Sequence, residues 1–325
     1  MAPPRVSVMI PNLDGARYLA GTVESALAQT RGDLVVRVVD NRSTDASASV
    51  CAAIDDPRLS FEPQRERVAM ADNWNRAARA ADTEFVAVLH NDDRWRPAFV
   101  EKMVAALDAA PDADAAFCGI AVIDADDRVV VPWIHRHRHD RPGPTSARDR
   151  DELLVRNTLL APSWLARRRL FDRVAWDSSL RWAPDWDFWL RAFDAAPERF
   201  TRVAEVLCEY RNHASSGTFQ PELVRRRLAE ESGIVERSLA RRATSPAVEE
   251  AARAGLLQRQ AAVFVQMALV GRGGLAADLA RDALGFAGGA GVARAALASV
   301  KQLGDPAWRA AIAEHLARTA SIRGR

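Results

Sequence analysis

Phe85-Val86-Ala87-Val88-Leu89-His90-Asn91-Asp92-Asp93 is an apolar run that stops abruptly at polar residues and two adjacent carboxylates. A short apolar run bounded in this way is typical of a strand in a sheet whose two faces are both covered. Comparable runs lie before and after it, at residues 6–10, 35–39, 59–62, 115–123 and 129–131. The segments between them have helical spacing, at residues 18–28, 43–54, 73–80 and 97–109, with Ser43 or Thr44 and Pro97 as predicted helix starts. This alternation predicts an α/β fold with a mostly parallel sheet flanked by helices.

The second half of the chain has a different composition. Residues 135–147 are rich in His, Arg, Pro and Gly, which predicts a mobile loop, and helical spacing returns at 148–156 and 185–195. From residue 220 onward, Ala, Leu and Arg recur at helical spacing. We therefore expect an α/β domain at residues 1–219 and a C-terminal α-helical subdomain at residues 220–325.

Composition excludes several classes of protein. The net charge is +2, from 45 basic and 43 acidic residues, so no overall basic field indicates a nucleic-acid partner. The three cysteines form no CxxC pair, and neither a signal peptide nor a long apolar run is present. These features favour a cytoplasmic protein, and they leave open a peripheral contact at the inner face of the membrane. The chain also lacks GxxxxGK[ST], GxSxG and HExxH motifs, which weakens kinase and hydrolase interpretations.

Polar clusters follow the predicted strands. Asn12-Leu13-Asp14 follows the first strand, Asp40-Asn41 the second, and His90 to Asp93 the fourth, while Asp185 and Asp187 open a later helix. Because the carboxyl ends of parallel strands meet at one edge, these groups are expected to share one cleft. Asp92 and Asp93 suit Mg²⁺ or Mn²⁺, although such pairs are also common in turns and helix caps.

Other candidates have two interpretations each. Asp40 either accepts hydrogen bonds from a nucleobase or ribose, or simply ends its strand. Asp185 is either a general base for an acceptor hydroxyl or a carboxylate stabilised by the helix dipole. Trp182, Trp186 and Trp189 have helical spacing, which suits either sugar stacking or core packing. The alternating run from His135 to His139 is better explained as a solvated basic loop than as a ligand site.

The order of these clusters resembles the family 2 glycosyltransferases, which have the GT-A (Rossmann-like) fold. Residues 8–30 resemble the opening P-x-Y-N, Y-L and S-x-L-x-Q-T patterns, and residues 39–45 resemble V-D-D-G-S-T-D. Residues 73–77 match N-W-N-R-A, and residues 89–93 fall at the D-x-D-D metal motif. Residues 183–191 resemble E-D-W-D-x-W-L-R, and Tyr210-Arg211-Asn212-His213 resembles the closing Y-R-x-H segment. The resemblance covers about residues 5–218.

The resemblance implies an inverting transfer of a sugar from a nucleoside-diphosphate donor, UDP- or dTDP-linked, to an acceptor hydroxyl of a polysaccharide or glycolipid. It implies that Asp185 is the catalytic base and that Mn²⁺ or Mg²⁺ is the cofactor, held by Asp92, Asp93 and His213. The implied donor-binding residues are Pro11, Asn12, Asp14, Asp40, Asn73, Asn91 and Asp92, and the implied acceptor-side residues are Trp182, Trp186 and Asp187.

Five positions depart from the family pattern, and the first is Asp14, which replaces the usual asparagine. His90 replaces the first aspartate of D-x-D, Pro184 replaces the glutamate of E-D, and Asn41 and Arg42 replace D-G. A non-catalytic sugar-nucleotide-binding module is therefore the alternative. A sugar nucleotidyltransferase is a third interpretation, weakened because no Gly-rich basic loop follows the first strand.

Overall fold

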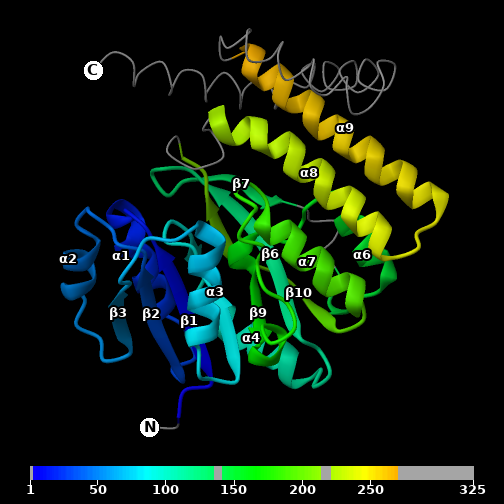
Figure 1. Cartoon of the computed structure of the whole chain (residues 1–325). Coiled ribbons are helices and arrows are strands. Elements are labelled where there is room, and N and C mark those ends of the chain that lie inside the picture. The colour runs from blue at the N-terminus through cyan, green and yellow to red at the C-terminus, as the bar shows by residue number, and fades with distance from the viewer. Residues whose placement is uncertain (1–2, 135–140, 214–220, 270–325) are drawn as a thin grey trace. The chain divides into compact units, whose positions relative to one another are not determined.

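The computed structural model describes residues 3–134, 141–213 and 221–269, and its chain divides into two compact units. The first unit comprises Met1–Leu153 and Asn157–His213, and the second comprises Leu154–Arg156 and Ala214–Arg325. The predicted division at residues 219 and 220 stays a prediction. Figure 1 shows the elements of both units along the chain.

A mixed sheet forms the centre of the first unit, in the order β3-β2-β1-β4-β9-β6-β10-β5, with β7 paired to β6 and β8 to β10 (Figure 1). Neighbouring strands β3, β2, β1 and β4 pair in parallel, as do β6 and β10. The strands are β1 Val6–Asn12, β2 Leu34–Asp40, β3 Leu59–Pro63, β4 Phe85–Val88, β5 Arg94–Trp95, β6 Ala115–Ile123, β7 Val129–Ile134, β8 Gly143–Pro144, β9 Trp164–Arg167 and β10 Phe200–Arg211.

Helices cover this sheet because their apolar faces pack on its buried strands. A single core cluster joins α1 and α4 to side chains of β1, β2 and β4, and buried residues of the helices recur at helical spacing. The helices of this unit are α1 Ala16–Leu27, α2 Ser47–Ala52, α3 Met70–Ala80, α4 Phe99–Asp108, α6 Ala147–Val155 up to Leu153, and α7 Pro184–Ala195, with 3₁₀ turns η1 Ala161–Ser163 and η2 Arg168–Leu170. The predicted α/β class is therefore confirmed.

Some predicted boundaries are wrong. The first strand reaches Asn12 rather than ending at residue 10. Helix α2 begins at Ser47, without a cap from Ser43 or Thr44, because the Ser43 hydroxyl bonds to Asp40 and the Asp45 carboxylate accepts the Ser47 N–H. Pro97 lies just before α4 rather than in its first turn. The predicted loop at 135–147 lies partly outside the described residues, and its described end contains β8 and the start of α6.

The second unit contains the predicted helices in its described part. Helices α8 (Pro221–Arg241) and α9 (Pro246–Leu269) pack against each other. Arg259 in α9 donates to the Glu231 carboxylate at 3.0 Å and to the backbone oxygen of Val155, which belongs to the same unit. The remaining predicted helices, from residue 270 onward, lie outside the described residues. In the described part of the chain, no helix combines the length and apolar character that crossing a membrane requires.

Candidate active site

The ends of β1 and β2 are tied together by side-chain hydrogen bonds. Asn12 and Asp40 end their strands as register partners, and the Asn12 amide donates to Asp40 Oδ1 at 2.8 Å. Asp40 Oδ2 also accepts the backbone N–H of Ser43 at 2.9 Å. Asp14 joins the two loops, because its backbone N–H donates to the Ser43 hydroxyl and its carboxylate accepts the Thr44 N–H. Asp40, 3% exposed, is thus oriented by its own loop.

The end of β4 is attached to the same network. The Asn91 amide donates to Asn12 Oδ1 at 2.7 Å. Gly15 makes this contact sterically feasible, since a Cβ there would lie 2.1 Å from Asn91 Nδ2 and 2.4 Å from Asn12 Oδ1. The structure therefore brings Asn12, Asp40 and Asn91 together, as the sequence predicted.

Pro11 and Asn73, the other predicted donor residues, are both buried. Pro11 lies on β1 opposite Val39. Asn73 lies on α3, is 4% exposed and donates to the Val39 backbone oxygen at 3.4 Å. Its Oδ1 is buried without a hydrogen-bond partner among the described residues.

His90, Asp92 and Asp93 form a cluster whose candidate ligand atoms all lie within 4.8 Å of one another. Asp93 is fully buried, and its Oδ1 accepts the Arg211 backbone N–H at 2.8 Å. Burial, assisted by the neighbouring Asp92, raises the pKa of Asp93 well above its ordinary value. Burial lowers the pKa of His90 and so favours its neutral imidazole. Within the described residues, His90 Nε2 and Asp93 Oδ2 are buried without hydrogen-bond partners.

His213 joins this cluster from the end of β10. Its Nε2 lies 3.1 Å from Asp92 Oδ2, and its ring packs on Tyr18 with the ring centroids 4.9 Å apart. Arg211, two residues before His213, donates from Nε to the Asp92 backbone oxygen at 2.7 Å and so holds the end of β10 beside Asp92. Asp92, Asp93 and His213, the three predicted metal ligands, thus lie together.

Asp185 lies in the first turn of α7, after Pro184 at the first helical position. Its Oδ1 accepts the Trp186 backbone N–H at 2.8 Å, and its Oδ2 accepts the Asn157 amide N–H at 3.1 Å. Burial raises the pKa of Asp185 to about 6, and the hydrogen bond from Asn157 opposes that rise. No sequence motif contains Asn157, an isolated asparagine, so its contact with Asp185 was not predicted.

A series of aromatic contacts connects the acidic cluster with the helix that carries Asp185. The Trp74 ring packs on His90 at 4.7 Å and on Trp176 at 5.9 Å between centroids. Trp176 stacks on Phe188 of α7 at 4.5 Å. Asn75 also exchanges two hydrogen bonds with the backbone of Trp176. The acidic cluster and helix α7 are therefore joined by packed side chains.

The predicted acceptor-side residues differ in exposure. Trp186 is 1% exposed and donates its indole N–H to the Leu153 backbone oxygen at 2.7 Å. Asp187 is 2% exposed and pairs with Arg191 at 2.7 Å. Trp186 and Trp189 thus belong to the core, and the side chains of Trp186 and Asp187 are almost fully buried. Trp182 is half-buried and remains a candidate for the acceptor side.

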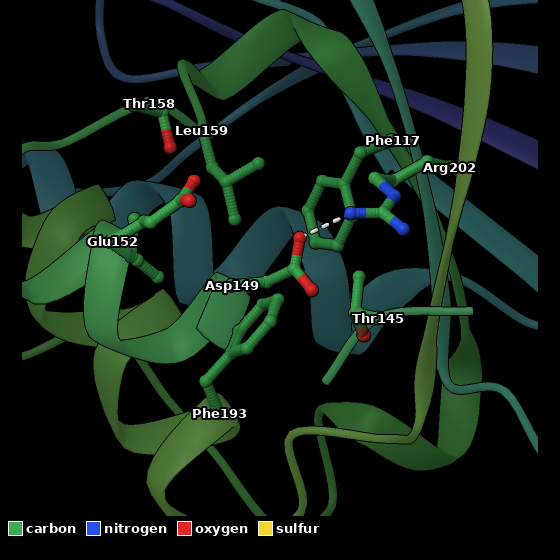
Figure 2. Close-up of a pocket in the computed structure, with 9 residues that line it drawn as sticks. Phe117, Thr145, Asp149, Glu152, Thr158, Leu159, Phe193 and Arg202 are labelled. Atoms are coloured by element: carbon green, nitrogen blue, oxygen red, sulfur yellow. Dashed lines mark hydrogen bonds and ion pairs between the residues drawn. The ribbon is translucent and has the colours of Figure 1, made fainter. Parts of the chain in front are cut away.

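A separate pocket lies between α6, α7, β6 and β10 (Figure 2). Asp149 and Arg202 form an ion pair on its wall, and Phe117, Phe193 and Leu159 supply apolar surface. None of the predicted donor, metal or base residues lines this pocket. Thr158 and Leu159 on its wall directly follow Asn157 in the chain.

The fold and the acidic site at the strand ends define a GT-A type α/β protein, and solved structures share this fold. A mannosyltransferase from Pyrobaculum calidifontis, in complex with GDP-Man and Mn²⁺, superposes with a TM-score of 0.57 at 18% identity, covering 99% of this chain and 87% of that chain. Residues 1–349 of S. aureus TarS with UDP-GlcNAc give a TM-score of 0.56 at 18% identity, covering 78% and 81%.

Sequence comparison gives the family. Residues 7–175 match the family described as Glycosyl transferase family 2, so the chain belongs to that family. An uncharacterised glycosyltransferase of Rickettsia typhi is 26% identical over 219 residues, which are 66% of this chain and 66% of the relative. A PGL/p-HBAD biosynthesis glycosyltransferase of Mycobacterium bovis is 29% identical over 211 residues, 64% of this chain and 76% of the relative. The chain thus spans about two thirds of the length of the first of these relatives.

Proposed function

We propose that this protein is an inverting glycosyltransferase that moves a sugar from a nucleoside-diphosphate donor to an acceptor hydroxyl. The observation that carries the proposal is Asp185: it is a carboxylate with a pKa raised to about 6, connected through ring contacts to the cluster at His90, Asp92 and Asp93. A general base is most effective when its pKa lies near the working pH.

The acidic cluster fits a divalent cation. The unpartnered buried atoms of His90 and Asp93 are ligand atoms, and Asp92 supplies an adjacent carboxylate. We propose that Asp92 holds Mn²⁺ or Mg²⁺, with Asp93 and His213 nearby. A cation bound there supplies Lewis-acid stabilisation of the negative charge on the departing diphosphate.

The donor is proposed to lie over the strand ends. Asn12, Asp40 and Asn91 form one hydrogen-bonded network there, with Pro11, Asp14 and Asn73 around it. UDP- or dTDP-linked sugars are the donors that the family resemblance favours. The complexes of the neighbouring proteins with UDP-GlcNAc and with GDP-Man support a nucleotide-sugar donor.

In the proposed reaction, Asp185 accepts the proton of the acceptor hydroxyl. The acceptor oxygen forms a bond to the anomeric carbon, on the face opposite the diphosphate, while the bond from that carbon to the diphosphate oxygen breaks. One displacement of this kind inverts the anomeric configuration. We further propose a glycan or glycolipid acceptor and a cytoplasmic protein that contacts the inner face of the membrane. The names of two relatives, for succinoglycan biosynthesis and for PGL/p-HBAD biosynthesis, support such an acceptor.

The test is donor turnover by Asp185→Asn. Loss of the base should lower kcat by about 10²–10⁴, while a UDP-sugar with Mn²⁺ should still raise the melting temperature as it does for the wild type. Asp172→Asn is the matched control, because Asp172 is an exposed carboxylate. Near-normal turnover by Asp185→Asn would reject the base assignment. Donor binding without turnover by the wild type would favour the non-catalytic binding module.

A further inference from the structure

Asn157 is held by hydrogen bonds at both ends of its side chain. Its Nδ2 donates to Asp185 Oδ2 at 3.1 Å, and its Oδ1 accepts the Leu159 backbone N–H at 3.3 Å. A backbone N–H can only donate, so the bond from Leu159 identifies the oxygen end of the amide. The nitrogen end therefore faces Asp185.

The segment that carries Asn157 is anchored in the core of the first unit. Thr158 is 4% exposed and Leu159 is 6% exposed. Figure 2 shows both on the wall of the pocket, together with Phe193 of α7. Since α7 also carries Asp185, the donor and the acceptor of this hydrogen bond are fixed by elements that line the same pocket.

Asp185 interacts with neutral donors. Burial raises its pKa, and the N–H groups of Asn157, Trp186 and Asp185 itself lower it. No charged side chain in the described part of the chain is among the groups that set this pKa. A cation in place of Asn157 would stabilise the carboxylate much more strongly and so weaken it as a base.

We propose that Asn157 is a positioning residue for the base: it fixes the Asp185 carboxylate in one orientation and stabilises its charged form without neutralising it. This inference rests on the proposed role of Asp185. The neutral amide offers one hydrogen bond to Oδ2 and leaves further lone pairs of the carboxylate for the acceptor hydroxyl.

The experiment is the pH dependence of kcat/KM for the wild type, Asn157→Leu and Asn157→Ser. The wild type should lose activity as pH falls through about 6. Asn157→Leu removes the amide N–H that donates to Asp185 while keeping a similar side-chain volume. The acid side of the pH profile of kcat/KM should therefore move to higher pH by about one unit, and kcat should fall about tenfold. Asn157→Ser retains a hydroxyl that can donate a hydrogen bond, so its pH profile should shift less and its kcat should fall less than those of Asn157→Leu. The KM for the donor should stay nearly constant.

A purely structural role would lower kcat at every pH and leave the acid side of the pH profile in place, and that result would overturn the inference. The Asp185 carboxyl is also titrated directly by ¹³C NMR, with Asp185→Asn used to assign its signal. A higher pKa in Asn157→Leu than in the wild type supports the inference even if no transfer is detected, and an unchanged pKa overturns it. Turnover by Asp185→Asn separately reports on the proposed function.

Discussion

At the scale of single residues, His90 is the departure from the family's D-x-D pattern that has the clearest chemical consequence. Mg²⁺ prefers oxygen ligands in near-ideal octahedral geometry, whereas imidazole suits transition metals. The His90 ring is packed against Trp74, its Nε2 is buried and unpartnered within the described residues, and its Nδ1 lies 3.9 Å from Asp93 Oδ2. A nitrogen ligand at this position should favour Mn²⁺ over Mg²⁺.

We therefore expect His90→Asp to shift metal preference toward Mg²⁺. The measurement is loss of the free Mn²⁺ electron paramagnetic resonance signal on protein binding, followed by competition with Mg²⁺. The variant should need about tenfold less Mg²⁺ than the wild type to release Mn²⁺. Asp92→Asn is the control that should weaken binding of both ions. The same competition curve for wild type and His90→Asp would show that His90 is not a ligand.

Sequence patterns predicted candidate site residues that occupy motifs, and they did not predict Asn157, which we propose acts through Asp185. Asp92 and Asp185 were found because each falls in a recognisable cluster after a strand or at a helix start. Asn157 lies 28 positions from Asp185, next to the buried residues Thr158 and Leu159. No local spacing encodes such a contact. Likewise, helical spacing alone did not decide that Trp186 is buried.

At the scale of elements, the close approach of three strand ends depends on the missing side chain at Gly15. Gly15→Ala would place a methyl group against Asn12 and Asn91 and break their hydrogen bond. We expect a loss of about 1–3 kcal/mol in the free energy of unfolding and weaker donor binding. Urea unfolding and nucleotide-dependent thermal shift measure these two effects. Gly32→Ala is the control, since no atom lies within 4 Å of its added Cβ. Equal stability of the two variants would contradict this account.

The apolar pattern of β6 predicted that strand from the sequence, whereas the pattern of β10 did not. Residues 115–123 form β6 as expected, because nearly all of that strand is buried. Residues 200–211 form the long strand β10, yet charged residues break its apolar pattern. Their charges are paired with residues of other elements: Arg202 with Asp149 of α6, Glu205 with Lys102 of α4 and Glu209 with Arg94 of β5. Tertiary ion pairs of this kind are invisible to hydrophobic periodicity.

At the scale of the whole molecule, three arginines of the first unit pair with one buried carboxylate, Asp114, just before β6. The Asp114 side chain is 2% exposed and accepts hydrogen bonds from Arg169 at 2.9 Å, from Arg199 at 2.8 Å and from Arg173. These arginines come from η2, from the turn after it and from the residue just before β10. One buried carboxylate thus joins segments that are far apart in sequence.

Replacing the Asp114 carboxylate by an amide should lower the free energy of unfolding. Burial tends to raise the pKa of Asp114, but the hydrogen bonds from its arginines outweigh burial and lower the pKa below its ordinary value. A lowered pKa in the folded state means that the stabilisation is present above the pKa of the unfolded chain and is lost as pH falls through the folded value. Asp114→Asn should therefore lower the free energy of unfolding by about 2–4 kcal/mol at about pH 7.

The difference between wild type and Asp114→Asn should begin to shrink below about pH 4, where the unfolded chain takes up a proton at Asp114. It should disappear only below the lowered pKa of the folded state, where the carboxyl is protonated in both states. Urea unfolding at neutral and acid pH measures both effects. Asp82→Asn is the matched control: Asp82 pairs with Arg37 but is 68% exposed, so its removal should cost less than about 1 kcal/mol. Equal losses for the two variants, or a difference that does not change with pH, would mean that the three arginines hold these segments together through contacts other than Asp114.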